Sequence, residues 1–78
     1  MGRQPKQEKD QLINHVESYR TKLGLSRQQL ADTVGVHLQT IGYIERGEYA
    51  PTLALALRLA KALQCSTEEL FQPKGDSE

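Results

Sequence analysis

The sequence predicts a small all-α domain, a compact bundle of about five helices. Three observations support this prediction. Apolar residues recur at intervals of three and four along the chain, residues that cap helix starts precede them, and glycines follow them. No segment alternates apolar and polar residues over the length of a strand, so we expect no sheet.

The first two helices are predicted from an apolar face and a capping box. The first helix ends before Gly24, and its apolar face comprises Leu12, Ile13, Val16, Tyr19 and Leu23. The second begins at Ser26, whose hydroxyl is placed to accept a hydrogen bond from the amide of Gln29, while the Gln29 side chain returns one. Gly35 ends this helix after a short apolar face.

The third and fourth helices follow the same rules. The third is expected from about His37 to Arg46 and is ended by Gly47. The fourth runs from Thr52 to Gln64, and its predicted core stripe comprises Leu53, Ala56, Leu57, Ala60 and Leu63. Leu55 and Leu59 widen the stripe, which predicts a central and heavily buried helix.

A second capping box, Ser66-Thr67-Glu68-Glu69, opens a final turn or two that contains Leu70 and Phe71. Polar residues dominate both ends of the chain. The predicted organisation is therefore a polar N-terminal arm (residues 1–10), one folded domain (11–72) and an acidic C-terminal tail (73–78).

Composition and charge exclude several functional classes. The 78 residues suffice for one modest core, and no apolar run approaches the roughly 18 residues of a membrane span. The start of the chain lacks the apolar segment of a signal peptide, so we expect a cytoplasmic protein. Ten basic residues balance ten acidic ones, but residues 66–78 carry a net charge of −3, which leaves a mildly basic body.

The sequence does not predict catalytic or metal chemistry. Cys65 is the single cysteine, and together with His15 and His37 it gives no spacing typical of a metal site, so we expect it to be a small apolar filler. No residue pair suggests a nucleophile with its base, and no glycine-rich loop is suited to a phosphate. We therefore predict a protein that is not an enzyme, with no metal, no cofactor and no small-molecule substrate.

The turn between the second and third helices favours a helix-turn-helix. Ala31 is small where the two helices would cross, and Gly35 can adopt a positive φ in the turn. The spacing from Arg27 to Arg46 is that of the motif, whose second helix enters the major groove of DNA.

Five segments resemble the Cro/repressor-type (Xre-like) helix-turn-helix regulators. They are LSRQQLA (25–31), TVGV (33–36), QTIGYIERG (39–47), APTLALALRLAKAL (50–63) and STEELF (66–71). The resemblance covers roughly residues 11–72 and implies a lambda-repressor-like DNA-binding domain of prokaryotic or phage-like origin. It also implies binding to double-stranded DNA, commonly as a homodimer on an inverted repeat.

Helical geometry places one polar stripe on the third helix. Taking 100° per residue and the direction midway between Ile41 and Ile44 as inward, the outward stripe comprises Gln39, Gly42, Tyr43 and Arg46. Leu38 lies at its border, and Glu45 turns partly inward.

Four residues are the predicted base readers: Leu38, Gln39, Gly42 and Tyr43. The Gln39 amide can donate to N7 and accept from N6–H of adenine. Tyr43 can meet a base edge, a thymine methyl or a phosphate, and Leu38 either touches a thymine methyl or extends the core. Gly42 either allows close approach to the groove or is only tolerated, at a cost of about 0.5 to 1 kcal/mol relative to alanine.

Six further residues are predicted to contact phosphates or to position the helix: Arg27, Gln28, His37, Thr40, Arg46 and Tyr49. Arg27 stands beside a helix N-terminus suited to a phosphate, and the alternative is an ordinary exposed arginine. His37 is a poor N-cap, so the third helix starts weakly unless its imidazole contacts a phosphate. Thr40 either reaches a phosphate or packs at the helix flank.

The resemblance implies that Arg20 and Glu45 form a partly buried ion pair between the first and third helices.

Two residues depart from the family pattern, and each carries an expectation of its own. Glu48 stands where relatives often have a basic residue, which predicts weaker phosphate binding by the loop that follows the third helix. Gln64 stands where relatives often have a helix-ending glycine, which predicts either mild strain or a different ending of the fourth helix.

The leading functional prediction is a sequence-specific transcriptional regulator, most simply a repressor that covers a promoter. The candidates for its dimer surface are Leu70, Phe71 and the outward leucines of the fourth helix. The alternative is an antitoxin-like or coactivator-like protein-interaction module, which the zero net charge and the apolar Leu38 and Tyr43 favour. Only the DNA reader should lose affinity steeply as salt rises.

Overall fold

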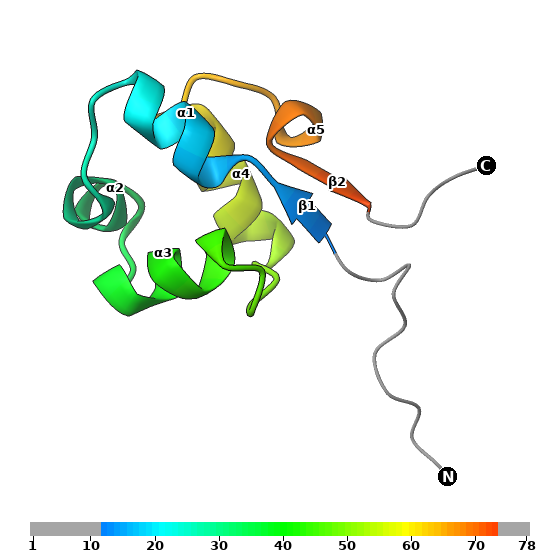
Figure 1. Cartoon of the computed structure of the whole chain (residues 1–78), viewed down its shortest axis with the longest axis horizontal. Coiled ribbons are helices and arrows are strands. Elements are labelled where there is room, and N and C mark those ends of the chain that lie inside the picture. The colour runs from blue at the N-terminus through cyan, green and yellow to red at the C-terminus, as the bar shows by residue number, and fades with distance from the viewer. Residues whose placement is uncertain (1–11, 74–78) are drawn as a thin grey trace, which may run out of the picture.

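The computed structural model describes residues 12–73 and contains five helices and a small sheet (Figure 1). The helices are α1 (Val16–Lys22), α2 (Arg27–Val34), α3 (Leu38–Glu45), α4 (Leu53–Ala62) and α5 (Thr67–Leu70), and the strands are β1 (Leu12–Asn14) and β2 (Phe71–Pro73). The predicted five-helix bundle with a helix-turn-helix is confirmed. The N-terminal arm and all of the acidic tail except Pro73 lie outside the described residues.

The two strands correct the expectation of a sheet-free fold and of a first helix that includes Leu12. β1 pairs with β2 in antiparallel register, with Leu12 opposite Pro73 and Asn14 opposite Phe71. The Asn14 side chain accepts a hydrogen bond from the amide of Val16 at 3.2 Å, and such a local bond competes with helix formation. The helix therefore begins only at Val16, although the apolar spacing continues further towards the N-terminus.

Both predicted capping boxes are present. In the first, the Gln29 amide donates to Ser26 Oγ at 3.0 Å and the Ser26 amide donates to Gln29 Oε1 at 2.8 Å. In the second, Ser66 and Glu69 exchange the corresponding bonds at 2.9 Å each. These bonds satisfy amides that a helix start leaves without backbone partners, so they fix where α2 and α5 begin.

The orientation of α4 confirms part of the predicted core stripe, because Ala56, Ala60 and Leu63 are buried, and corrects the rest. Leu55 and Leu59 face the core, at 5% and 0% exposure, whereas Leu53 and Leu57 are 73% and 53% exposed. Apolar residues surround most of this helix, so periodicity alone could not decide which side packs against α2 and α5. Gln64 has a φ of 62°, the left-handed conformation that favours glycine, in agreement with the predicted strain after the helix.

One core joins the helices. Its buried members are Val16, Leu30, Ala31, Val34, Ile41, Ile44, Leu55, Leu59, Ala60, Leu63 and Leu70. Because Leu70 is fully buried, it is excluded from the dimer surface for which the sequence suggested it. Cys65 is partly buried against this core, as predicted for an apolar filler, and burial followed by the charge of Glu69 raises the pKa of its thiol.

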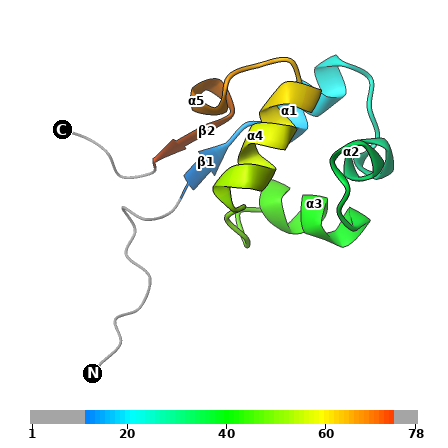
Figure 2. The same ribbon diagram turned by 180° about the vertical axis from the view of Figure 1, so that it is seen from behind.

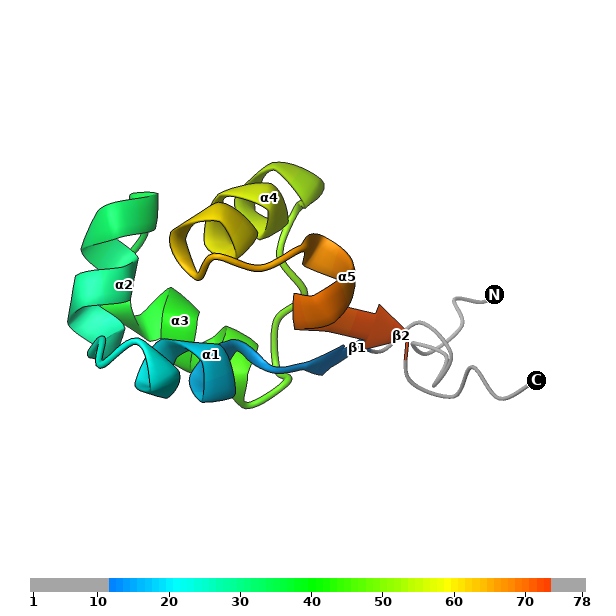
Figure 3. The same ribbon diagram turned by 90° about the horizontal axis from the view of Figure 1, so that it is seen from above.

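The helices surround the core from several sides. Figure 2 shows the sheet at one end of the molecule and α2 at the other. Figure 3 shows α1 and α4 on opposite sides of the bundle. Within residues 12–73, no helix has the length and apolar character that crossing a bilayer requires.

Candidate nucleic-acid interface

The turn between α2 and α3 sets the direction of α3. Gly35 ends α2 with a φ of 80°, and its amide donates to the carbonyl of Ala31 at 2.8 Å. Ala31 is fully buried, and Ile41 and Ile44 anchor α3 in the core at 0% and 1% exposure. With these two side chains inward, the opposite side of α3 faces outward, along the lower edge of the bundle in Figure 1.

The outward side of α3 carries a shallow pocket of about 310 Å³. Its lining comprises Arg27, Leu38, Gln39, Gly42, Tyr43 and Arg46. Leu38 is 43% exposed and Tyr43 44%, so neither side chain belongs to the core. The predicted base-reading residues thus surround one surface hollow, with an arginine from α2 beside them.

Gly42 departs from the prediction that it lies open on the outward stripe. Its position faces the surface, yet it is buried because the side chain of Arg46 covers it. A Cβ atom built on Gly42 would lie 3.2 Å from Nη1 of Arg46, which is tighter than an ordinary contact. The same guanidinium lies 5.2 Å from the centre of the Tyr43 ring, within the range of a cation–π contact.

Glu48 holds the Arg46 side chain from the turn that follows α3. Nε of Arg46 donates to Oε2 of Glu48 at 3.2 Å, and Nη2 donates to Oε1 at 3.3 Å. This pairing raises the pKa of Arg46. Sequence reasoning missed the pair and treated Glu48 only as a missing basic residue, although its position two residues after Arg46, across Gly47, was a usable signal.

The predicted contact between Arg20 and Glu45 is present and is joined by a second arginine. Arg20 Nε donates to Glu45 Oε2 at 2.7 Å, and Arg27 Nε donates to Oε1 at 2.8 Å. The Glu45 side chain is 1% exposed, and Arg20 also donates to the carbonyl of Leu25 at 2.9 Å. Three helices, α1, α2 and α3, therefore meet at one carboxylate.

Two opposing effects act on this carboxylate. Desolvation by itself would raise the pKa of Glu45, because burial disfavours the charged form. The hydrogen bonds and charges of Arg20 and Arg27 together outweigh it and lower the pKa below its ordinary value. Glu45 is consequently ionised at neutral pH, and the Arg27 side chain, which remains 42% exposed, is held beside α3.

The other predicted phosphate contacts lie around α3. His37 is exposed and its side chain makes no capping hydrogen bond, as expected of a poor N-cap. Thr40 and Tyr49 line a second hollow of about 370 Å³ together with Tyr43 and Glu48. Gln28 donates its side-chain amide to Asp32 at 2.9 Å, so part of its hydrogen-bonding capacity is already used.

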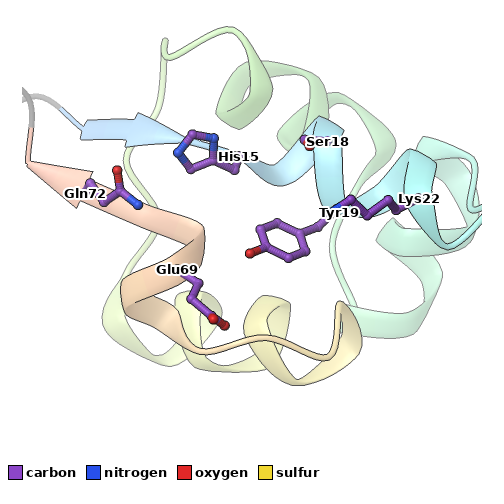
Figure 4. A pocket seen from close by; sticks show the side chains of 6 residues that line it. All are labelled: His15, Ser18, Tyr19, Lys22, Glu69 and Gln72. Atoms are coloured by element: carbon purple, nitrogen blue, oxygen red, sulfur yellow. The ribbon is translucent and has the colours of Figure 1, made fainter.

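A separate polar pocket of about 290 Å³ lies between α1 and α5. Its lining comprises His15, Ser18, Tyr19, Lys22, Glu69 and Gln72 (Figure 4). Partial burial and then the charge of Glu69 raise the pKa of Tyr19, and Lys22 Nζ lies 5.2 Å from the centre of its ring. None of the predicted DNA-contacting residues lines this pocket, so it is distinct from the α3 surface.

Comparison with known proteins agrees with this geometry. A family model described as helix-turn-helix matches residues 16–70. The uncharacterised helix-turn-helix transcriptional regulator YgzD of Bacillus subtilis is 43% identical over 58 residues, which are 74% of this chain and 88% of YgzD. The control protein C.SmaI of Serratia marcescens is 42% identical over 67 residues, 86% of this chain and 80% of C.SmaI.

The restriction-modification controller protein C.AhdI of Aeromonas hydrophila has a similar solved structure. Its TM-score is 0.69 at 37% sequence identity, and the match covers 73% of this chain and 86% of C.AhdI. The family match spans every helix of the described chain, including the turn that orients α3. The chain therefore belongs to the Cro/C1-type helix-turn-helix family of DNA-binding transcriptional regulators, which are not enzymes.

Proposed function

We propose that the protein recognises a specific double-stranded DNA sequence through α3 and represses transcription by covering a promoter. One observation carries the proposal: the core holds Ile41 and Ile44, while the opposite side of α3 presents an amide, an aromatic ring and a guanidinium around one hollow. Glu45 and its two arginines hold α3 against α1 and α2. A helix fixed in this way can enter the major groove without reordering.

Gln39 is the leading base reader in this proposal. Its side chain is exposed in the hollow, and its amide matches the acceptor and donor that adenine shows in the major groove. The 43% exposure of Leu38 supports a contact with a thymine methyl over a role in the core. Tyr43 lies one turn from Gln39 and supplies a ring and a hydroxyl to the same surface.

Phosphate contacts would frame this surface. Arg27 is half-exposed at the start of α2, where helix amides also face outward, and His37 and Thr40 stand at the start of α3. Gln28 and Tyr49 would add further phosphate contacts beside these residues. These contacts supply affinity and register, whereas the hollow supplies sequence preference.

A homodimer on an inverted repeat fits the exposed apolar surface. Leu53 and Leu57 are the most exposed large apolar residues of the described chain, and a groove of about 380 Å³ beside Leu53 includes Phe71 and Glu68. Recognition helices of such a dimer lie about 34 Å apart on successive major grooves.

Selection of targets from a random pool of double-stranded DNA tests the proposal. At low salt the wild-type protein should enrich one motif with two inverted halves. Gln39→Ala should relax the preference at one base pair of each half while non-specific binding remains nearly intact. Gln72→Ala, a matched change on β2 away from α3, should return the wild-type motif. Failure of folded wild-type protein to enrich any motif would contradict the proposal.

A protein-interaction module, antitoxin-like or coactivator-like, is the second candidate function. The exposed apolar Leu38 and Tyr43 on the same surface and the zero net charge favour it. Titration with salt separates the two. Each neutralised phosphate contributes about −0.9 to the slope of log affinity against log salt, so a DNA reader with several phosphate contacts shows a steep decline.

The relatives suggest which genes to examine first. C.SmaI is named a control protein, and C.AhdI is described as a restriction-modification controller. We therefore propose restriction-modification genes as the first candidates for regulation. Binding of purified protein to promoter fragments from the neighbourhood of its own gene would test this idea directly.

A further inference from the structure

We propose that Arg46 reads a guanine in the major groove, that Glu48 orients its guanidinium for this contact, and that Gly42 is the recess in which the guanidinium lies. The inference rests on the proposed function, because it assigns a base to the same α3 surface. It changes the role of Arg46 from a phosphate contact to a base reader. It also explains Gly42 and Glu48 together, because both position the guanidinium of Arg46.

The guanidinium lies within the reading surface rather than at its edge. Arg46 follows α3 immediately, yet its side chain folds back along the helix, so that Nη1 lies over Gly42. It lines the same hollow as Gln39 and stacks near the ring of Tyr43. Its side chain is 49% exposed, so the group is held in place but still faces outward.

The hydrogen-bond pattern leaves the required edge of the guanidinium unused. A guanidinium has five N–H donors in one plane. Glu48 engages Nε and one hydrogen of Nη2, which leaves a parallel pair of N–H groups on Nη1 and Nη2. Guanine presents O6 and N7 as two adjacent acceptors in the major groove, and a bidentate arginine is the commonest specific contact to them.

The ion pair serves orientation better than stability. Both side chains are about half exposed, at 49% and 55%, and an exposed pair of this kind contributes little to folding. A carboxylate beside the DNA backbone would by itself repel phosphates. Paired with Arg46, Glu48 instead limits the rotamers of a long side chain that would otherwise move freely.

Gly42 completes the arrangement because it has no side chain. An added Cβ would lie 3.2 Å from Nη1, so the guanidinium would have to shift by a few tenths of an ångström. The helical conformation of residue 42 is open to any amino acid, so backbone geometry does not require glycine there. The position of the Arg46 guanidinium is therefore the feature that a substitution would disturb.

Quantitative binding to the selected motif, with each base pair replaced in turn, tests the inference. Wild-type protein should prefer guanine at one position by about tenfold or more. Arg46→Lys keeps the charge but loses the paired donors, so this preference should fall to within about twofold while the salt slope stays the same. Glu48→Gln and Gly42→Ala should weaken the same preference, and Glu48→Asp should retain part of it.

The outcomes separate the inference from the proposed function. If wild-type protein enriches a motif whose preferences Arg46→Lys does not alter, Arg46 is a backbone contact and the inference is wrong. If Arg46→Lys weakens binding to all sequences equally, Arg46 is likewise a backbone contact and the inference is wrong. If wild-type protein enriches no motif, the proposed function fails and the inference falls with it. Thermal unfolding of each variant shows whether it is folded, and Gln72→Ala is the matched control on the surface away from α3.

Discussion

Glu45 holds two arginines at one nearly inaccessible carboxylate, and each has a different energetic role. Arg20 is 10% exposed and also donates to the carbonyl of Leu25, whereas Arg27 is 42% exposed. Removing Arg20 leaves the buried carboxylate with one of its three arginine hydrogen bonds, the one from Arg27. Removing the exposed partner lets water take the vacated position.

At this scale we expect Arg20→Ala to be much more damaging than Arg27→Ala. Loss of Arg20 should lower the free energy of unfolding by about 3 kcal/mol, the typical cost of breaking a buried pair. Loss of Arg27 should cost about 1 kcal/mol or less, as for exposed pairs. Urea denaturation followed by circular dichroism measures both values. Equal effects would show that Arg27 carries as much of the compensation as Arg20.

Glu45 also predicts how stability depends on pH. Its pKa is lower in the folded protein than the value of about 4.3 expected for an unfolded chain, so ionised Glu45 favours folding above that pH. This contribution is lost as the pH falls from about 4.3 through the lower pKa of the folded state. Denaturation between pH 7 and pH 3 should show a smaller decline for Glu45→Gln than for wild type. Parallel declines would rule out Glu45 as a source of the acid sensitivity.

At the scale of elements, capping chemistry predicted more than apolar periodicity did. Ser26 and Ser66 correctly marked the starts of α2 and α5, because a capping box is a local interaction written in four adjacent residues. The start of α1 was predicted wrongly, and the predicted core stripe of α4 was right for Ala56, Ala60 and Leu63 but wrong for Leu53 and Leu57. Leu12 belongs to a strand whose partner lies at the other end of the chain, and Leu57 faces away from a core that tertiary packing selects.

In the candidate site, too, local features were predicted, whereas some contacts between elements were not. Helical geometry and the family resemblance were enough to place Gln39, Tyr43 and Arg46 on one side of α3 and Glu45 on the other. The second arginine on Glu45 and the partner of Arg46 depend on side-chain rotamers that cross between elements. Residue spacing does not specify these rotamers, so the position of Glu48 two residues after Arg46 marked it as a candidate partner but did not give the hydrogen-bonded geometry.

Ser26→Ala tests the contribution of a capping box to the motif. Loss of the bond that the Gln29 amide donates should lower the free energy of unfolding by about 1 kcal/mol. Ser18→Ala, an exposed serine within α1, should change it by less than about 0.5 kcal/mol. Thermal and urea unfolding of both variants provide the comparison. A similar effect of the two changes would mean that the box contributes no more than an ordinary surface serine.

At the scale of the whole molecule, the exposed leucines of α4 predict assembly. Leu57→Glu places a charge at the centre of the proposed dimer surface and should convert dimers to monomers, because a buried unpaired charge is costly. Sedimentation equilibrium measures the change, which should exceed about tenfold in the dissociation constant. Ser18→Glu adds the same charge on α1 and should leave the dissociation constant unaltered. A wild-type protein that remains monomeric on its selected DNA would contradict the dimer.

The pairing of β1 with β2 makes the described chain almost a closed ring. Leu12 and Pro73 lie opposite each other, so the two ends of the domain are hydrogen-bonded neighbours although some sixty residues separate them. Because these ends are neighbours, the order of the helices along the chain can change while their packing in space stays the same. The fold is therefore suited to circular permutation, in which a short linker joins the strands and new ends open in the exposed turn at Gly24.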